Sequence, residues 1–263
     1  MRSMALINHK GGVGKTTATF NLAWAWADKN YKTMAIDLDP QGALSASMGH
    51  VNAEHGMDWY LKTDVPVRDI RINIGKNIWL IPPGSLLSDI KVSWGAHQAR
   101  YSQRLHQLIV EAQESGMDFV VFDCPPADLW VIELLVGTVG ALLIPVTPDY
   151  LALQGLSMLM KKLAEENDEK GPEVYVFLTR YQARKRIAQE AEQMLKQHFG
   201  SHLLEAKIRE AVAVAESPGF GQSIFQYASR HPAAMDYLDL AGEIISRLTL
   251  QSNYSATYAG KQT

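Results

Sequence analysis

Apolar stretches of strand length alternate along the chain with segments of helical periodicity. Uninterrupted apolar runs predict strands at 4–8, 33–37, 77–84, 118–123, 140–146 and 173–179. Apolar positions spaced three or four residues apart predict helices at 15–30, 99–115, 150–167, 183–199 and 232–249. Apolar strands separated by helices are typical of an α/β fold with a doubly wound, mostly parallel sheet flanked by helices.

The same pattern predicts a single domain over residues 1–250, because it contains no internal repeat and no linker rich in Pro, Gly or Ser. Residues 50–76 are the least regular part, and we expect them to form a surface excursion. The last segment, 251–263, is polar and predicts a flexible tail.

Composition narrows the class of protein. The chain has 263 residues, 47% of them hydrophobic, and a net charge of −3, which indicates a globular protein without an overall attraction for nucleic acid. Its one cysteine, Cys124, excludes an internal disulfide and a multi-cysteine metal site. No apolar run approaches the ~20 residues of a membrane span, and no signal peptide precedes the first strand, so we expect a cytoplasmic protein.

The segment NHKGGVGKTT, residues 8–17, carries the clearest chemistry. It follows a strand and opens a helix, which is the context of a phosphate-binding P-loop. Glycines at 11, 12 and 14 allow backbone N–H groups to turn around phosphate oxygens, and the start of the helix adds further donors. We expect Gly11, Gly12, Val13 and Gly14 to surround ATP phosphates, with Lys15 on the β and γ phosphates, Thr16 on Mg²⁺ and Thr17 on the α phosphate.

Acidic residues follow two of the predicted strands. Asp123 ends the strand DFVVFD, and Asp37 and Asp39 lie in IDLDPQG after the strand that follows the first helix. Since the carboxyl ends of parallel strands meet at one edge, we expect Asp123 and Asp37 near Mg²⁺ and Asp39 near the attacking water. The alternative is that Asp37 or Asp39 only caps the helix that follows.

KGGVGKTT, DLDPQG, DCPPA and YLALQGLSML together resemble the ParA/Soj family of partition ATPases, which belongs to the deviant Walker A class that also contains MinD. AESPGFGQSI at 215–224 is similar to a late segment of the same family, so the resemblance extends from residue 4 to about residue 245. It implies a homodimer with ATP at the interface, in which Lys10 reaches the partner's phosphates. It also implies that Asp39 is needed for hydrolysis and that Asp123 is the second acidic motif.

Other members of the class have features that are absent from this sequence. MinD ends in a basic amphipathic helix that binds membranes, whereas YSATYAGKQT has one lysine and no apolar face, so we expect no membrane binding. A lone Cys124 cannot supply the shared iron–sulfur cluster of nitrogenase iron proteins. The remaining alternative is a metabolic ATP-dependent enzyme of the same fold, such as a dethiobiotin-synthetase-like ligase, against which DLDPQG argues.

The resemblance implies a partition cycle. The ATP dimer would bind DNA of the nucleoid without sequence preference, and a ParB-like or other adaptor would stimulate an ATPase that is weak alone. The cargo would be a plasmid, a chromosome origin, or a protein complex such as a carboxysome or chemoreceptor cluster.

The basic residues that would contact DNA depart from the family pattern. Aligned on Ala215 and Glu216, the family's two arginines fall at Glu210 and Ala213, and Arg209 lies one place away. The densest basic cluster is instead in TRYQARKRIAQ at 179–189. We therefore expect DNA contacts from Arg180, Arg184, Lys185, Arg186 and Arg209, with Tyr181 against a sugar; a solvated helix start is the alternative.

Overall fold

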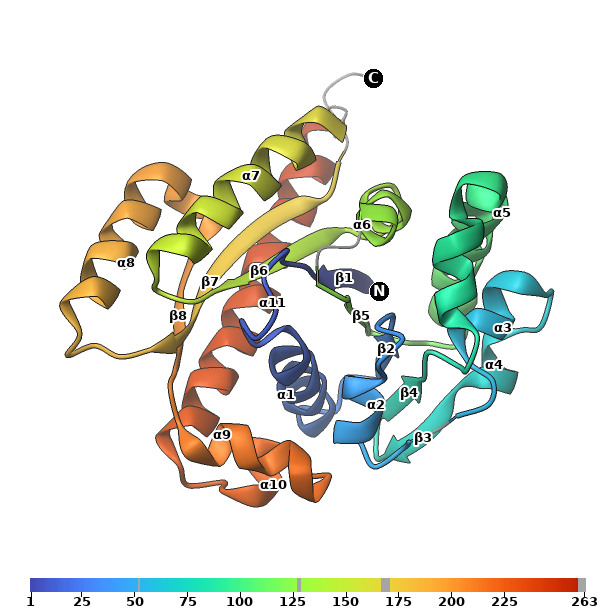
Figure 1. Ribbon diagram of the computed structural model, residues 1–263, viewed down its shortest axis with the longest axis horizontal. Helices are drawn as coiled ribbons and strands as arrows, with labels where there is room; N and C mark the ends of the chain where they lie inside the picture. The colour runs from blue at the N-terminus through green and yellow to red at the C-terminus, as the bar shows by residue number, and fades with distance from the viewer. Residues whose placement is uncertain (52, 127–128, 167–170, 260–263) are drawn as a thin grey trace.

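One eight-stranded sheet forms the centre of the computed structural model, which describes residues 1–51, 53–126, 129–166 and 171–259 (Figure 1). The strands are β1 (Arg2–Leu6), β2 (Thr33–Asp37), β3 (Ile72–Gly75), β4 (Ile78–Ile81), β5 (Phe119–Asp123), β6 (Ala141–Val146), β7 (Glu173–Tyr181) and β8 (Leu203–Arg209). Their order is β3-β4-β2-β5-β1-β6-β7-β8, and within it the β3–β4 pair is antiparallel while the other pairs are parallel. The predicted fold class is thereby confirmed.

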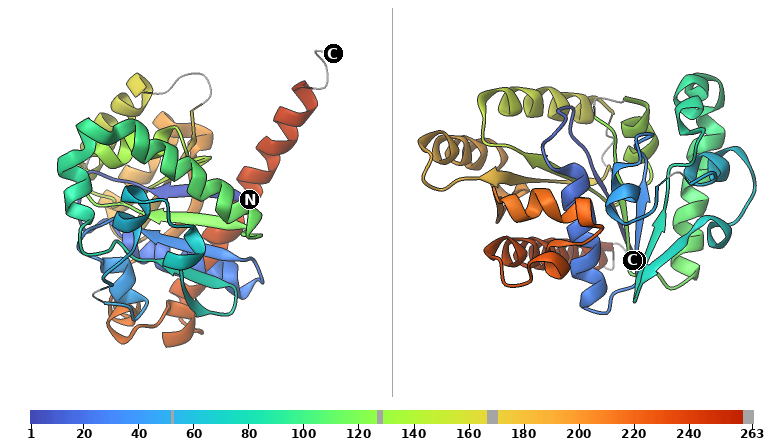
Figure 2. Two further views of the ribbon diagram at one scale, coloured as in Figure 1. Left: turned by 90° about the vertical axis from the view of Figure 1, so that its right-hand side faces the viewer. Right: turned by 60° about the horizontal axis from the view of Figure 1, so that its bottom comes forward.

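Helices cover both faces of this sheet (Figures 1 and 2). They are α1 (Lys15–Asp28), α2 (Ala43–Ser47), α3 (Met57–Lys62), α4 (Val67–Ile70), α5 (Leu87–Glu114), α6 (Leu129–Val136), α7 (Tyr150–Glu166), α8 (Arg186–Phe199), α9 (Val212–Glu216), α10 (Ile224–Tyr227) and α11 (Pro232–Ala259). Two short 3-10 turns, η1 (Gly200–His202) and η2 (Ser217–Phe220), complete the set. Within the described residues, no helix combines the length and apolar character needed to span a membrane.

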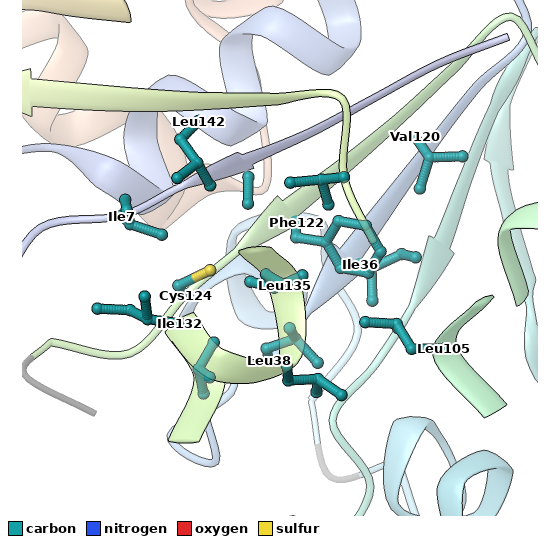
Figure 3. Close-up of a cluster of buried hydrophobic side chains, with 14 of the residues drawn as sticks. Ile7, Ile36, Leu38, Leu105, Val120, Phe122, Cys124, Ile132, Leu135 and Leu142 are labelled. Atoms are coloured by element: carbon teal, nitrogen blue, oxygen red, sulfur yellow. The ribbon is translucent and has the colours of Figure 1, made fainter. Parts of the chain in front are cut away.

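The strands send alternate side chains into two separate cores. In β1, Met4 and Leu6 pack on the side of α1 and α11, while Ala5 packs on the side of α5 and α6. This alternation is why a strand buried on both faces reads as a continuous apolar run. Figure 3 shows part of the second core, in which Cys124 lies beside apolar side chains and is 3% exposed. Cys124 is therefore a core residue.

The parallel strands place their carboxyl ends along one edge. Asp37 at the end of β2 and Leu6 at the end of β1 both pair in register with Asp123 of β5, and Leu6 pairs on its other side with Leu143 of β6. The loops that follow these strands are therefore neighbours. These loops, the strand ends at Asp37 and Asp123 and the first turn of α1 together contain every residue that the sequence assigned to nucleotide chemistry.

Several predicted boundaries were wrong. The helix expected from residue 99 begins at Leu87, because Leu87, Ile90 and Trp94 add a buried stripe among many exposed positions. Residues 50–76 contain α3, α4 and β3, and Tyr60 of α3 is fully buried, so this segment is more than a surface excursion. β3 and β8 were not predicted, since both lie at sheet edges and are only partly buried. The last helix was expected to end at 249 but extends to Ala259, whereas the single domain over 1–250 and the flexible tail over 251–263 stay predictions.

Candidate active site

The P-loop lies between β1 and α1 and is held by the strands beside it. Asn8 donates from Nδ2 to the Pro145 carbonyl at 2.7 Å and accepts from the Lys10 backbone at 2.9 Å. On the other side, the Thr179 hydroxyl donates to the Val13 carbonyl at 2.7 Å. β6 and β7 therefore fix both halves of the loop before any ligand binds.

The loop ends in a left-handed residue. Gly14 has φ 92° and is the N-cap of α1, a conformation that L side chains rarely adopt. Gly11 and Gly12 are exposed, and Thr16 and Thr17 are half-buried in the first turn of α1. No side chain caps this helix, so its first N–H groups remain available to an anion.

Lys15 occupies the centre of the loop. Its side chain is 6% exposed, and Nζ donates to the carbonyls of Asn8 at 3.2 Å and Lys10 at 3.3 Å. Burial lowers the pKa of Lys15, and the nearby carboxylate of Asp123 opposes that shift. Among the described residues, the ammonium thus bonds only to neutral carbonyls, and phosphate oxygens are stronger acceptors than these carbonyls.

Two carboxylates lie side by side beneath the loop. Asp37 and Asp123 are directly opposite each other on neighbouring strands, and both are fully buried. Thr16 of α1 donates to Asp123 Oδ2 at 2.7 Å, which brings the predicted metal residues Thr16 and Asp123 together. Burial raises the pKa of Asp37 to about 6 and that of Asp123 well above its usual value, the latter with help from the charge of Asp37.

Asp37 also has the structural role that sequence left open. Its Oδ2 accepts from the backbone N–H and the hydroxyl of Ser45 in α2, at 2.9 and 2.8 Å, while Oδ1 accepts from the Asp39 backbone at 3.1 Å. Asp37 therefore caps α2 and orders the loop that carries Asp39. Asp39 itself is half-exposed and accepts from the Gln41 backbone at 3.0 Å.

These residues suit a phosphate-bound Mg²⁺. Burial raises the pKa of both carboxylates even though the Lys15 ammonium opposes the shift at Asp123, and each accepts from a hydroxyl, Asp37 from Ser45 and Asp123 from Thr16. Within the described ranges no group of three or more His, Cys, Asp or Glu side chains could hold a metal ion unaided. Mg²⁺ in nucleotide sites takes one or two carboxylates, phosphate oxygens and water, so the donor set fits an ion that arrives with a nucleotide.

Lys10 points away from this centre. Its Nζ lies 2.9 Å from both carboxylate oxygens of Asp149, in the loop between β6 and α7. Asp149 also accepts from the Thr147 hydroxyl at 2.6 Å and from the Ala152 backbone at 2.9 Å. Burial opposes ionisation, but these hydrogen bonds prevail and lower the pKa of Asp149. The two lysines of one loop therefore have different surroundings.

Sequence reasoning missed Asp149, Ser45 and Thr19. Asp149 follows a predicted parallel strand, so the rule that brought Asp37 and Asp123 to the site also applies to it. Thr19 donates from its buried hydroxyl to the Lys15 carbonyl at 3.1 Å and approaches Asp123 at 3.5 Å. A buried threonine one turn into an apolar helix leaves no mark in a hydrophobic pattern.

The predicted DNA-binding residues lie around the ends of β7 and β8, and three of them are ion-paired. Arg180 contacts Glu210 at 3.0 Å, and Arg186 contacts Glu190 at 2.7 Å. Arg209 donates from Nε and Nη2 to Asp236, each at 2.7 Å. Arg184 and Lys185 form no ion pair with any described residue.

Tyr181 does not offer a free ring. Its hydroxyl donates to Glu192 at 2.7 Å, and the Lys207 ammonium lies 5.3 Å from the ring centroid. The expectation that Tyr181 lies flat against a sugar conflicts with these contacts, because the ring is packed against the core.

Comparisons with known proteins agree with this geometry. A family model described as an AAA domain matches residues 1–175. The chain is 31% identical to the chromosome partitioning protein ParA of Caulobacter vibrioides over 254 residues, covering 94% of this chain and 95% of that protein. It is also 31% identical to the chromosome-partitioning ATPase Soj of Thermus thermophilus over 251 residues, covering 94% and 97%.

A solved structure shows that the fold alone does not identify the family, because an enzyme with a different function shares it. Cobyrinic acid a,c-diamide synthase from Mycobacterium smegmatis, with a bound ATP analog and magnesium, has a TM-score of 0.79 and 19% identity over 95% of this chain and 96% of that one. Fold and P-loop define an ATPase of the AAA-domain class. Within that class, identity over nearly the whole length decides the family, and the chain belongs to the ParA/Soj partition ATPases.

Proposed function

We propose that this protein is a partition-type ATPase that dimerises around ATP, binds DNA without sequence preference in that state, and positions a cargo. The observation that carries the proposal is the separation of the two P-loop lysines. Lys15 Nζ bonds within the loop, whereas Lys10 Nζ is 2.9 Å from Asp149 outside it. A lysine on the outer side of the loop would serve a second nucleotide, which a partner subunit would bring.

The chain's own residues would divide the work of ATP hydrolysis. Gly11, Gly12, Val13, Gly14 and Thr17 would bind the phosphates through backbone and hydroxyl donors, with Lys15 on the β and γ phosphates. Mg²⁺ bound with ATP would neutralise phosphate charge, held by Thr16 and, directly or through water, by Asp123 and Asp37.

Asp39, on the loop that Asp37 orders, would orient the attacking water. Lys10 would stabilise the negative charge that develops on the partner's γ phosphate, so full activity would need the dimer.

Dimerisation would require Lys10 to leave Asp149. Both side chains are about two-fifths exposed, at 40% and 39%. Ion pairs with that degree of exposure contribute roughly 0–1 kcal/mol, so the exchange for a triphosphate costs little. The Lys10–Asp149 pair would therefore favour the monomer weakly and yield to ATP.

DNA contacts would begin with Arg184 and Lys185, which lack ion-pair partners among the described residues. Arg180, Arg186 and Arg209 would contribute in so far as phosphate competes with their carboxylate partners. Two copies in the dimer would double the patch and link DNA affinity to the bound nucleotide.

The protein would then act in the cytoplasm on the nucleoid, and an adaptor such as a ParB-like protein would stimulate its slow hydrolysis. The cargo would be a plasmid, a chromosome origin, or a protein complex such as a carboxysome or a chemoreceptor cluster. The metabolic alternative, a dethiobiotin-synthetase-like ligase, has only the shared fold in its favour.

The deciding experiment compares the wild type with Lys10→Ala and, as a matched control, Lys29→Ala at the exposed end of α1. Light scattering after size exclusion reports dimer mass with ATP and with ADP, and gel retardation of a DNA fragment reports DNA binding. Wild type and Lys29→Ala should dimerise and shift DNA with ATP alone. Lys10→Ala should bind ATP as a monomer and shift none. Dimers in Lys10→Ala, or no DNA shift at low salt by wild type, would contradict the proposal.

A further inference from the structure

The carboxylate of Asp123 contacts two hydroxyl groups of α1, one on each of its oxygens. Thr16 donates to Oδ2 at 2.7 Å, and the Thr19 hydroxyl lies 3.5 Å from Oδ1. Residues three apart on a helix lie on the same face, so the start of α1 presents both hydroxyls to the end of β5. Thr16 is a proposed Mg²⁺ ligand, whereas Thr19 has no role in the proposed site.

The surroundings of Thr19 are apolar. Thr19 is fully buried, and so are its neighbours Ala18, Phe20 and Leu22. A hydroxyl in such surroundings costs free energy unless it is hydrogen-bonded, and threonine favours a helix less than alanine does. The bond from Thr19 to the Lys15 carbonyl, four residues back at 3.1 Å, only offsets that cost. What an alanine or valine could not provide here is the contact with the carboxylate at the end of β5.

The two buried carboxylates of the site are held differently. Asp37 accepts from two backbone N–H groups and one hydroxyl, which Ser45 and Asp39 provide. Among the described residues, Asp123 accepts only from Thr16 and Thr19. The last torsion of an aspartate side chain is soft, so one donor on one oxygen leaves the plane of the carboxylate free to turn. A donor on each oxygen restricts that plane, and Thr19 provides the second donor.

The elements beside β5 offer no substitute for this donor. Asp123 lies in register between Leu6 of β1, which has no side-chain donor, and Asp37 of β2, whose charge disfavours a second carboxylate charge. The Lys15 ammonium bonds to backbone carbonyls of the P-loop instead. Without the Thr19 hydroxyl, Oδ1 of Asp123 would therefore have no donor from the described chain.

We propose that Thr19 is a positioning residue for the metal site: its hydroxyl holds Oδ1 of Asp123, so that Oδ2 and the Thr16 hydroxyl stay together as one binding unit for Mg²⁺. Thr19 acts through Asp123 and does not itself bind the ion. Groups that orient metal-binding side chains commonly contribute about 10-fold to 100-fold to metal affinity. The inference rests on the proposed function, in which Thr16 and Asp123 hold Mg²⁺.

The test measures metal affinity, so it does not depend on ATP hydrolysis. Mn²⁺ replaces Mg²⁺, because the electron paramagnetic resonance signal of free Mn²⁺ reports how much is bound, and it is titrated into the complex of the full-length chain with ADP. Thr19→Val keeps the shape of the side chain but removes the hydroxyl, and it should weaken Mn²⁺ binding by about tenfold. Thr19→Ser keeps the hydroxyl and should retain the affinity of wild type. Thr19→Ala repeats the measurement with a side chain too small to disturb the packing.

Thr33→Val is the matched control. Thr33 is also fully buried, and its hydroxyl also donates to a backbone carbonyl, that of Tyr31 at 3.2 Å, but it begins β2, at the opposite end of the strand from Asp37. This variant should bind Mn²⁺ as wild type does. The positioning role would be overturned by an equal loss in Thr33→Val, by unchanged affinity in Thr19→Val, or by a loss in Thr19→Ser. It would also be overturned if Thr19→Val lost as much affinity for ADP in EDTA, because the P-loop itself would then be distorted.

Asp123→Ala separates the inference from the proposed function. This substitution should weaken Mn²⁺ binding at least as much as Thr19→Val, and adding Thr19→Val to it should cause no further loss, because Thr19 acts through the carboxylate. A further loss in the double variant would overturn the inference, as would a weakened Asp123→Ala beside an unchanged Thr19→Val, and in both cases the metal site would stand. Mn²⁺ binding that Asp123→Ala does not weaken would overturn the proposed metal site and the inference with it.

Discussion

The two halves of the sheet edge differ in the surroundings of their carboxylates. On the β2 and β5 side, Asp37 and Asp123 are buried next to each other, and burial raises the pKa of both. On the β6 to β8 side, carboxylates are paired with cations, as in Lys10–Asp149 and Arg209–Asp236. There the hydrogen bonds of Asp149 outweigh its burial and lower its pKa.

We call the β2 and β5 side the binding half and the β6 to β8 side the switching half, because the difference in charge suits them to different tasks. Buried carboxylates whose pKa values are raised gain from a cation that arrives with phosphate, so the β2–β5 half favours ligand binding. Ion-paired charges are already stabilised, so they rearrange only when a partner provides a stronger interaction. The β6–β8 half therefore suits conditional contacts, with a second subunit or with DNA.

The largest expected effect concerns the binding half. Asp39→Ala should lower ATP turnover by about 10² to 10⁴-fold, the usual contribution of a residue that orients or deprotonates the nucleophile. ATP binding should persist, since the Asp39 carboxylate accepts from the Gln41 backbone of its own loop and forms no other hydrogen bond with a described residue. Phosphate release under single-turnover conditions gives the rate, and Asp28→Ala on the exposed end of α1 is the control. Turnover within tenfold of wild type would remove Asp39 from the hydrolytic step.

A smaller effect is expected on the switching half. Replacing both Arg184 and Lys185 by alanine should weaken DNA binding by about tenfold and lower the slope of log affinity against log salt by about 2, because two phosphate contacts are lost. Fluorescence anisotropy over a salt series measures both quantities. The matched control is Arg68→Ala with Lys76→Ala, at the β3 end of the sheet. An equal loss in that control would show that only net charge matters.

Sequence predicted the binding half far better than the switching half. The P-loop, Asp37 and Asp123 follow from strand ends in a parallel sheet, and Thr16 from its place in the loop, so short-range pattern and topology were sufficient. The ion pairs of Arg180 and Arg209 involve acids 30 and 27 residues away. Hydrophobic periodicity does not reveal such ion pairs. The prediction of DNA contacts therefore did not account for the acidic partners of these arginines.

Edges of the fold were missed for a related reason. Central strands are buried on both faces and are apolar throughout, whereas β3 and β8 are each half-covered and mix polar with apolar residues. The helix predicted for α5 began too late, because the first turns of α5 contain only Leu87, Ile90 and Trp94 as buried residues. Partly exposed elements such as β3, β8 and the start of α5 give weak patterns. The short helices α3 and α6 were also not predicted, although both bury apolar residues, because a short apolar run does not show helical periodicity.

The buried carboxylates also predict a dependence of stability on pH. Asp123→Asn removes an acid whose folded-state pKa lies above its unfolded value. Such an acid destabilises the fold increasingly as pH rises from the unfolded pKa towards the folded one, and fully above both. The nucleotide-free variant should therefore melt at a higher temperature than wild type at pH 8, by about 2–4 °C for each kcal/mol regained, and at the same temperature near pH 4. A variant that is less stable at pH 8 would show that Asp123 is already compensated.

The smallest effect tests the coupling between the halves. Asp149→Asn removes the charge that holds Lys10 but keeps one oxygen for the Ala152 N–H, so α7 should stay capped; the Thr147 hydroxyl, which now donates to the other carboxylate oxygen, can accept from the amide instead. Because the ion pair is 40% and 39% exposed, its loss should tighten the ATP-dependent dimer by no more than about fivefold. Sedimentation equilibrium with ATP measures this gain, and the same substitution in a Lys10→Ala background should produce none. A gain that persists without Lys10 would mean that Asp149 opposes dimerisation by its own charge, and the contrast between a binding half and a switching half would then rest on DNA alone.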